Sequence, residues 1–212
     1  MKIRILSLVF VLALVTLNAQ TSENSLANLK EGNERFLNNG QTPKQYLDDV
    51  KATSNGQSPY AIILSCADSR VPPELIFDES IGRLFVVRVA GNVTSPEALG
   101  SIEYGVDVLK ANLIVVLGHT KCGAVVAASS KKSYTPNIDA LIARIAPAVD
   151  AVEKKDGKGD KVEEMIKKNV ENQMSNLTSQ SSLLADRVKE GKVKIVGGVY
   201  SLESGKIELM GN

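Results

Sequence analysis

The sequence LIVVLGHTKCG at residues 113–123 and the sequence AIILSCADSRV at residues 61–71 share one pattern. Each is an apolar run of strand length that ends in a side chain able to bind a metal ion. The first carries His119 and Cys122, and the second carries Cys66; these are the single histidine and both cysteines of the chain. Runs that are apolar on both faces are typical of parallel strands that helices cover on both sides. We therefore expect a parallel sheet that presents these three side chains at one of its edges.

The rest of the chain alternates strands with helices. Strands are expected at residues 60–65, 84–89, 113–117, 193–200 and 206–210. Helices are expected at residues 21–39, 46–55, 95–109, 122–127, 138–152 and 162–177, with a short one near Pro72 and Pro73 and an interruption near residues 178–181. This alternation predicts a single α/β domain whose mainly parallel central sheet, with about four parallel strands and one antiparallel edge strand, is flanked by helices.

Composition narrows the classes of function. A chain of 212 residues is long enough for one domain with a sizeable core. The net charge of +1 gives no reason to expect nucleic acid or an anionic membrane surface as a partner. Tryptophan is absent and aromatic residues are few, which disfavours stacking platforms for bases.

The first residues resemble an export signal. Lys2 and Arg4 precede an apolar run at residues 5–17, and Ala19 offers a small residue for cleavage. We therefore expect a signal peptide at residues 1–19, a mature domain at residues 20–212 without a membrane segment, and a periplasmic or secreted location. The apolar run is too short to cross about 30 Å of hydrocarbon as a helix. The alternatives are a buried N-terminal helix and a retained anchor.

The three metal-capable side chains predict a zinc site. Carboxyl ends of parallel strands meet at one edge of a sheet, so Cys66 and His119 converge if their strands are neighbours. Cys122 follows His119 at a spacing that lets both bind one ion. Three protein ligands leave one tetrahedral position open, as in catalytic zinc sites, and thiolates with imidazole favour zinc over magnesium or calcium. The alternatives are a Cys66–Cys122 disulfide, core cysteines and a hydrogen-bonded loop histidine.

Asp68 and Arg70 lie directly beyond the first cysteine. Beside a metal ion, Asp68 can either fill the fourth position or turn to Arg70 and leave that position open. Arg70 would orient the carboxylate with a forked pair of hydrogen bonds. We therefore expect a catalytic pair that gates and orients. The alternative is that Asp68 caps the following turn and Arg70 makes an ordinary surface ion pair.

Six segments together resemble the β-class carbonic anhydrases. They are NERF at 33–36, CADSR at 66–70, FVVRVAGN at 85–92, SIEYGV at 101–106, GHTKCG at 118–123 and VGGVYSLESGKIE at 196–208. The resemblance implies zinc on Cys66, His119 and Cys122, and it implies a homodimer or a dimer of dimers with pockets at the subunit interface. It further implies substrate contacts from four residues, namely Gln57, Phe85, Tyr104 and Gly123. For the two aromatic residues the alternative is plain core packing.

Two departures from the family pattern affect this expectation little. The family's usual aspartate in the closing segment is Ser201 here, and no catalytic group depends on it. Some members use a tryptophan for a non-catalytic bicarbonate site, and this chain has none.

The activity that the resemblance implies is the zinc-dependent, reversible hydration of carbon dioxide to bicarbonate and a proton, by attack of zinc-bound hydroxide. We expect activity to rise above neutral pH. His119 is occupied by the metal, so protons must leave through buffer, water, a carboxylate or a phenol such as Tyr104. The alternatives are a related zinc hydrolase that acts on carbonyl sulfide or carbon disulfide, and a non-enzymatic binding domain stabilised by zinc or a disulfide.

Overall fold

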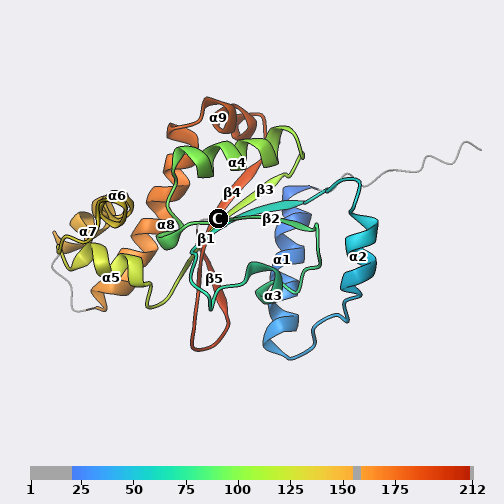
Figure 1. Ribbon diagram of the computed structural model, residues 1–212, viewed down its shortest axis with the longest axis horizontal. Coiled ribbons are helices and arrows are strands. Elements are labelled where there is room, and N and C mark those ends of the chain that lie inside the picture. Colours follow the sequence, from blue (N-terminus) through green and yellow to red (C-terminus); the bar gives the residue numbers. More distant parts are fainter. Residues whose placement is uncertain (1–20, 155–158, 211–212) are drawn as a thin grey trace, which may run out of the picture.

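The computed structural model describes residues 21–154 and 159–210 and contains a five-stranded sheet (Figure 1). The strands are β1 (Ala61–Ser65), β2 (Leu84–Arg88), β3 (Leu113–His119), β4 (Lys194–Tyr200) and β5 (Ile207–Met210). Their order is β2-β1-β3-β4-β5, in which β5 runs antiparallel to β4 and the other pairs are parallel. The predicted fold class is confirmed. The expected signal peptide lies outside the described residues.

The register of the sheet brings the two key stretches together. β1 lies between β2 and β3, and Ser65 is paired with Leu117 on one side and Arg88 on the other. β3 continues two residues beyond the predicted end at Leu117, because its neighbour β4 still pairs with it through His119 and Tyr200. His119 is therefore a strand residue, held by the backbone ladder rather than by a loop.

Helices cover both faces of the sheet, but unequally (Figure 1). α1 (Ser22–Leu37) and α3 (Pro73–Ile76) pack on one face. α4 (Pro96–Asp107), α5 (Gly123–Ser129), α7 (Ala146–Glu153), α8 (Lys161–Ser179) and α9 (Ser182–Lys189) contribute to the apolar core on the other. The remaining elements are α2 (Tyr46–Ala52), which buries none of its residues, α6 (Pro136–Ile142), and a short 3-10 turn at Ala90–Asn92.

The helix expected at residues 138–152 is wrong, because two helices occupy this region. α6 ends at Ile142, and α7 begins at Ala146 with Pro147 in its first turn. Proline lacks a backbone N–H and its ring excludes the preceding turn, so a helix can start at Pro147 but cannot run through it. The expected interruption near residues 178–181 is confirmed: Ser181 caps α9 by accepting a hydrogen bond from the Leu184 N–H at 3.2 Å. The helix expected at 46–55 ends earlier, at Ala52.

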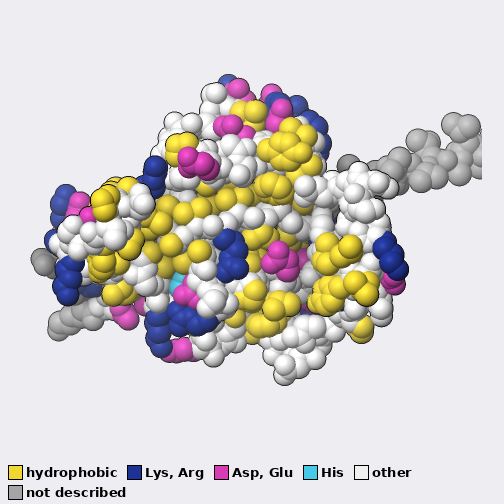
Figure 2. All heavy atoms as spheres, in the orientation of Figure 1, with side chains coloured by type: hydrophobic (Ala, Val, Ile, Leu, Met, Phe, Trp, Pro, Cys, Tyr) yellow, Lys and Arg dark blue, Asp and Glu magenta, His cyan; other side chains and the backbone are white. Residues whose placement is uncertain are grey.

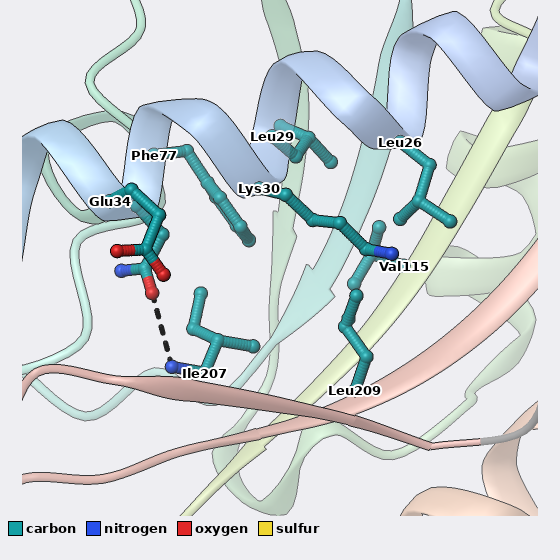
Figure 3. A pocket seen from close by; sticks show the side chains of 9 residues that line it. Leu26, Leu29, Lys30, Glu34, Phe77, Val115, Ile207 and Leu209 are labelled. Carbon is teal, nitrogen blue, oxygen red and sulfur yellow. Dashed lines mark hydrogen bonds between the residues drawn. The ribbon is translucent and has the colours of Figure 1, made fainter.

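A buried amide on α1, that of Asn33, joins this helix to α3, to the turn before β5 and to β5 itself. Asn33 donates from Nδ2 to the carbonyl oxygens of Ile76 and Gly205, both at 3.0 Å. Its Oδ1 accepts from the Ile207 N–H at 3.1 Å, which is the hydrogen bond drawn as a dashed line in Figure 3. Beside it, a hollow of about 60 Å³ separates α1 from β3 and β5. A space of this size is much smaller than an ordinary ligand pocket. The hollow is therefore a packing gap and not a substrate site.

No helix in the part of the chain that the structure describes combines the length and the apolar character that crossing a membrane requires.

Candidate metal centre

Cys66, His119 and Cys122 converge at the carboxyl edge of the sheet, as predicted. Cys66 directly follows β1, His119 ends β3, and Cys122 is the N-cap of α5. Their ligand atoms all lie within 4.8 Å of one another, and all three residues are buried. Both cysteines are free thiols, so the alternative of a Cys66–Cys122 disulfide is wrong.

The chain turns sharply between the second and third of these residues. Lys121 adopts a left-handed backbone with φ of 56°. This conformation is uncommon for a residue with a side chain, and it reverses the chain within two residues of the strand end. Cys122 can therefore point back toward His119 while it starts α5. Because of this turn, two residues that are three positions apart in the sequence can direct their ligand atoms toward one point, which we call the focus of the site.

His119 presents one nitrogen to the focus and uses the other to hold its ring. Nδ1 lies 2.9 Å from the carbonyl oxygen of Thr120, which can only accept, so Nδ1 carries the proton. Nε2 is buried and has no hydrogen-bond partner among the described residues. A buried polar atom without a partner is costly, and a metal ion at the focus would remove that cost. This orphaned nitrogen is direct evidence that the three residues fit a metal.

The pKa values of the two thiols are shifted in opposite directions. The pKa of Cys66 is lowered to about 4 because the Cys122 thiol donates to its sulfur, and because His119 and the Gly91 N–H also act on it. The Gly91 nitrogen lies 3.2 Å from that sulfur. The pKa of Cys122 is raised by its hydrogen bond to the Cys66 thiolate and by burial. Burial opposes the charged form of His119, but the Cys66 thiolate raises its pKa. A divalent cation would bind both sulfurs as thiolates, and a sulfur and imidazole donor set suits zinc.

Asp68 and Arg70 form the expected forked pair. Arg70 donates from Nε to Asp68 Oδ1 at 2.9 Å and from Nη2 to Oδ2 at 2.8 Å, and its backbone N–H also bonds Oδ1. The Arg70 hydrogen bond holds the pKa of Asp68 well below its usual range. Asp68 Oδ2 is 3.8 Å from His119 Nε2, so the carboxylate faces the metal-capable group.

Arg88 and Gly91 also contact the site, and sequence reasoning did not single them out. Arg88 donates from Nη2 to the Asp68 carbonyl at 2.5 Å and from Nε to the Cys66 carbonyl at 3.2 Å. These bonds clamp the turn between β1 and α3. Arg88 ends β2, so its position at the same sheet edge as Cys66 was a usable signal.

The four residues predicted to contact substrate do not all lie together in the single chain. Phe85 and Tyr104 lie against each other, with ring centroids 6.3 Å apart, and Tyr104 is 47% exposed. Gly123 is the first residue of α5, next to Cys122, and within the described part of the chain no atom lies within 4 Å of the place a Cβ would take. Gln57 is exposed in the loop before β1, at the end of that strand opposite Cys66. A strand of this length spans roughly 16 Å, so Gln57 does not reach the metal-capable group of its own chain.

Comparison with known proteins gives consistent matches. A family model described as carbonic anhydrase matches residues 61–207, a range that includes all three metal-capable residues and both members of the Asp68–Arg70 pair. Carbonic anhydrase 2 of Mycobacterium tuberculosis is 42% identical over 186 residues, which cover 85% of this chain and 89% of that protein. Carbonic anhydrase of Mycolicibacterium smegmatis is 38% identical over 187 residues, with 85% and 89% covered. The solved structure of the β-carbonic anhydrase CcaA superposes with a TM-score of 0.70 at 26% identity, covering 87% of this chain and 94% of that one.

Proposed function

This chain belongs to the β-class carbonic anhydrases, and we propose that it uses zinc held by Cys66, His119 and Cys122 to hydrate carbon dioxide reversibly to bicarbonate and a proton. One observation carries the proposal: a buried Cys-His-Cys group whose histidine Nε2 has no other partner among the described residues. When bound, zinc supplies the Lewis acidity that makes water a nucleophile at neutral pH. The protein would hold the zinc ion through the three ligand residues, and Asp68 with Arg70 would orient the groups that react at it.

Asp68 is proposed to gate and orient the open position, and Arg70 to hold Asp68. Arg70 occupies both carboxylate oxygens and keeps Asp68 ionised, so the carboxylate acts as a hydrogen-bond acceptor only. With Oδ2 3.8 Å from His119 Nε2, a donor placed between the metal and Asp68 would be oriented by it. The Arg88 bonds to the carbonyls of Cys66 and Asp68 keep this turn rigid.

The activity test uses zinc content and carbon dioxide hydration in the same preparations. We expect one zinc per wild-type chain, and we expect that Cys122→Ser does not retain zinc through dialysis. Asp68→Asn keeps the shape but loses the charge that Arg70 binds. It should retain zinc and lose about 10- to 100-fold in hydration rate.

Asp107→Asn is the matched control, because Asp107 also pairs with an arginine, Arg187 at 2.7 Å, but lies at the end of α4. It should leave the hydration rate unchanged. A zinc-free wild type, or an Asp68→Asn enzyme of full activity, would contradict the proposal. Hydrolysis of carbonyl sulfide or carbon disulfide without hydration of carbon dioxide would assign the site to the related hydrolases.

We further propose that the pocket is completed by a second copy of the chain in a homodimer or a dimer of dimers. Gln57 cannot reach the metal-capable group of its own chain, whereas a neighbour could supply it. Figure 2 shows hydrophobic side chains gathered over α2, β2 and α4 on one face. Exposed apolar residues there include Tyr46, Leu47 and Val50 on α2, Leu75 on α3 and Tyr104 on α4. Contiguous exposed apolar surface of this kind is typical of an assembly interface.

The assembly test measures molar mass in solution. Wild type should have the mass of two or four chains. Leu47→Asp places a charge on a side chain that is 76% exposed in the single chain, and it should shift the protein toward smaller species. Val188→Asp, at another exposed apolar residue on α9, should not. A wild-type monomer with full activity would contradict the shared pocket.

The proposed location is periplasmic or secreted, after removal of residues 1–19. It rests on the charge and apolar pattern of the first residues alone. N-terminal sequencing of the mature protein from fractionated cells tests it. A cytoplasmic protein that retains Lys2 and Arg4 would contradict it.

A further inference from the structure

We propose that Asn169 and Gln173, two amides of α8, are positioning residues that aim the Gly91 N–H at the Cys66 sulfur; this inference rests on the proposed metal site. Both side chains are buried, at 1% and 0% exposure. Their hydrogen bonds to the described residues go to other groups than Cys66, His119 and Cys122. They act through the segment at residues 89–94, which passes between α8 and the end of β1.

The N–H and the carbonyl oxygen of Gly91 bond to different residues. Its N–H donates to Cys66 Sγ at 3.2 Å, and its carbonyl oxygen accepts from Asn169 Nδ2 at 2.8 Å. Asn169 therefore holds the residue whose amide contacts the thiolate. If Asn169 releases the carbonyl, the backbone around Gly91 loses the contact that determines its tilt.

Gln173 fixes both the loop and the orientation of Asn169. Its Oε1 accepts from the N–H and the hydroxyl of Thr94, each at 2.9 Å, and its Nε2 donates to Asn169 Oδ1 at 3.1 Å. The Gly91 carbonyl can only accept, so Asn169 must present Nδ2 to it and Oδ1 to Gln173. The whole chain of bonds is consistent in one orientation only.

The loop needs this support because its backbone is unusual. Gly91 and Asn92 are both left-handed, with φ of 69° and 46°. Such conformations cost of order 1–3 kcal/mol for a residue with a side chain, and they persist only when the surroundings hold them. A side chain at position 91 is also disfavoured, since its Cβ would lie 2.6 Å from Ile145 Cδ1 and 3.2 Å from Ala124 Cβ, and these neighbours would have to move.

A hydrogen bond to a ligand sulfur offsets part of its negative charge and fixes its direction. Removing such outer contacts typically lowers metal affinity or activity by 10- to 100-fold. The Gly91 N–H is a backbone group that substitution cannot delete. Asn169 is therefore the residue through which the contact can be tested.

The test compares Asn169→Leu with wild type, both loaded with zinc, by competition with a chelator and by the amide proton shift of Gly91. Leucine has a similar size and no donor. We expect at least 10-fold weaker zinc retention and an upfield move of the Gly91 amide proton, because its N–H loses the sulfur acceptor. Gln173→Glu retains the Thr94 acceptor and loses the donor to Asn169, so it should show a smaller change in the same direction.

Leu177→Ala is the control for loss of stability alone. Leu177 is buried on the same helix, and its truncation costs about 2–5 kcal/mol of folding stability. It should leave zinc retention and the Gly91 shift unchanged. Equal losses of zinc in Asn169→Leu and Leu177→Ala, or an unmoved Gly91 amide, would overturn the inference.

Should Asn169→Leu not fold, Asn169→Ala provides the same two measurements. A wild type that binds no zinc would instead overturn the proposed function, and the Gly91 shift in the metal-free protein would still decide whether Asn169 aims this amide.

Discussion

At the scale of single residues, Asp78 shows how a buried charge holds two segments together. Its side chain is 2% exposed and pairs with Arg35 at 2.6 Å and Lys44 at 2.8 Å. It also accepts from the N–H and hydroxyl of Thr42. Burial alone would raise the pKa of Asp78, but these donors hold it well below its usual range. Asp78 therefore ties α1 and the loop after it to the end of α3.

Asp78 makes a testable contribution to acid stability. Its folded pKa lies below the unfolded value of about 3.9, so its contribution is complete above that pH and is lost as the pH falls through the folded pKa. Asp78→Asn should lower the free energy of unfolding at pH 7 by about 3 kcal/mol, since it breaks a buried pair. The difference from wild type should shrink as the pH falls from 5 to 3. Urea unfolding at each pH measures it.

Asp48→Asn is the control for this experiment. The Asp48 side chain is 72% exposed, and its ion pair with Lys51 is long, at 3.6 Å. Replacing Asp48 should therefore change the free energy of unfolding by about 0–1 kcal/mol at any pH. An Asp78→Asn deficit that stays constant down to pH 3 would show that shape rather than charge makes the contribution.

At the scale of elements, α1 approaches α3 so closely that only glycine fits between them. A Cβ on Gly32 would lie 1.8 Å from the carbonyl oxygen of Phe77. This obstacle is backbone, so no side-chain rotation can relieve it. The packing of α1 on its face of the sheet therefore depends on a missing side chain as much as on its apolar stripe.

The same substitution in two helices should have opposite effects. Gly32→Ala should destabilise the protein by about 3 kcal/mol, because α1 must move away from α3. In α4, the Cβ of Gly100→Ala would have no atom of the described residues within 4 Å. This substitution should stabilise the protein by about 0.5–1 kcal/mol, because alanine restricts the unfolded chain. Thermal and urea unfolding of both variants measure the contrast. A harmless Gly32→Ala would contradict the close approach.

At the scale of the whole molecule, proton transfer is constrained by composition. The chain has one histidine, and that residue belongs to the metal-capable group. No second imidazole is present to carry protons from the site to solvent at neutral pH. The proton released with bicarbonate must therefore leave through buffer, water, a carboxylate or a phenol such as Tyr104, and we expect buffer to be the main acceptor.

The rate at saturating carbon dioxide should therefore depend on buffer. Raising the concentration of an imidazole buffer at constant pH and ionic strength should increase kcat several-fold, because buffer accepts the proton. The ratio kcat/KM should stay constant, since it does not include that step. Stopped-flow measurement of both parameters checks this. A kcat that ignores buffer concentration would point to an internal carrier such as Tyr104.

Much of the fold was predictable because its signals are local. Short, mostly apolar stretches predicted all five strands to within one or two residues. The break between α6 and α7 was also encoded locally, by Pro147, but the apolar periodicity of the region concealed it. The extension of β3 to His119 was not local, because it depends on the length of β4.

The order of the residues alone was enough to place a metal-capable group at one sheet edge, because strand ends and thiol or imidazole side chains can be read directly from the chain. Only the folded molecule could show that Gln57 lies at the far end of β1, and that Asn169, 78 positions from Gly91, bonds its carbonyl. An amide on a helix has the same appearance in a sequence whether it is buried or exposed. Its partner is chosen by packing between distant segments, and that choice exists only in three dimensions.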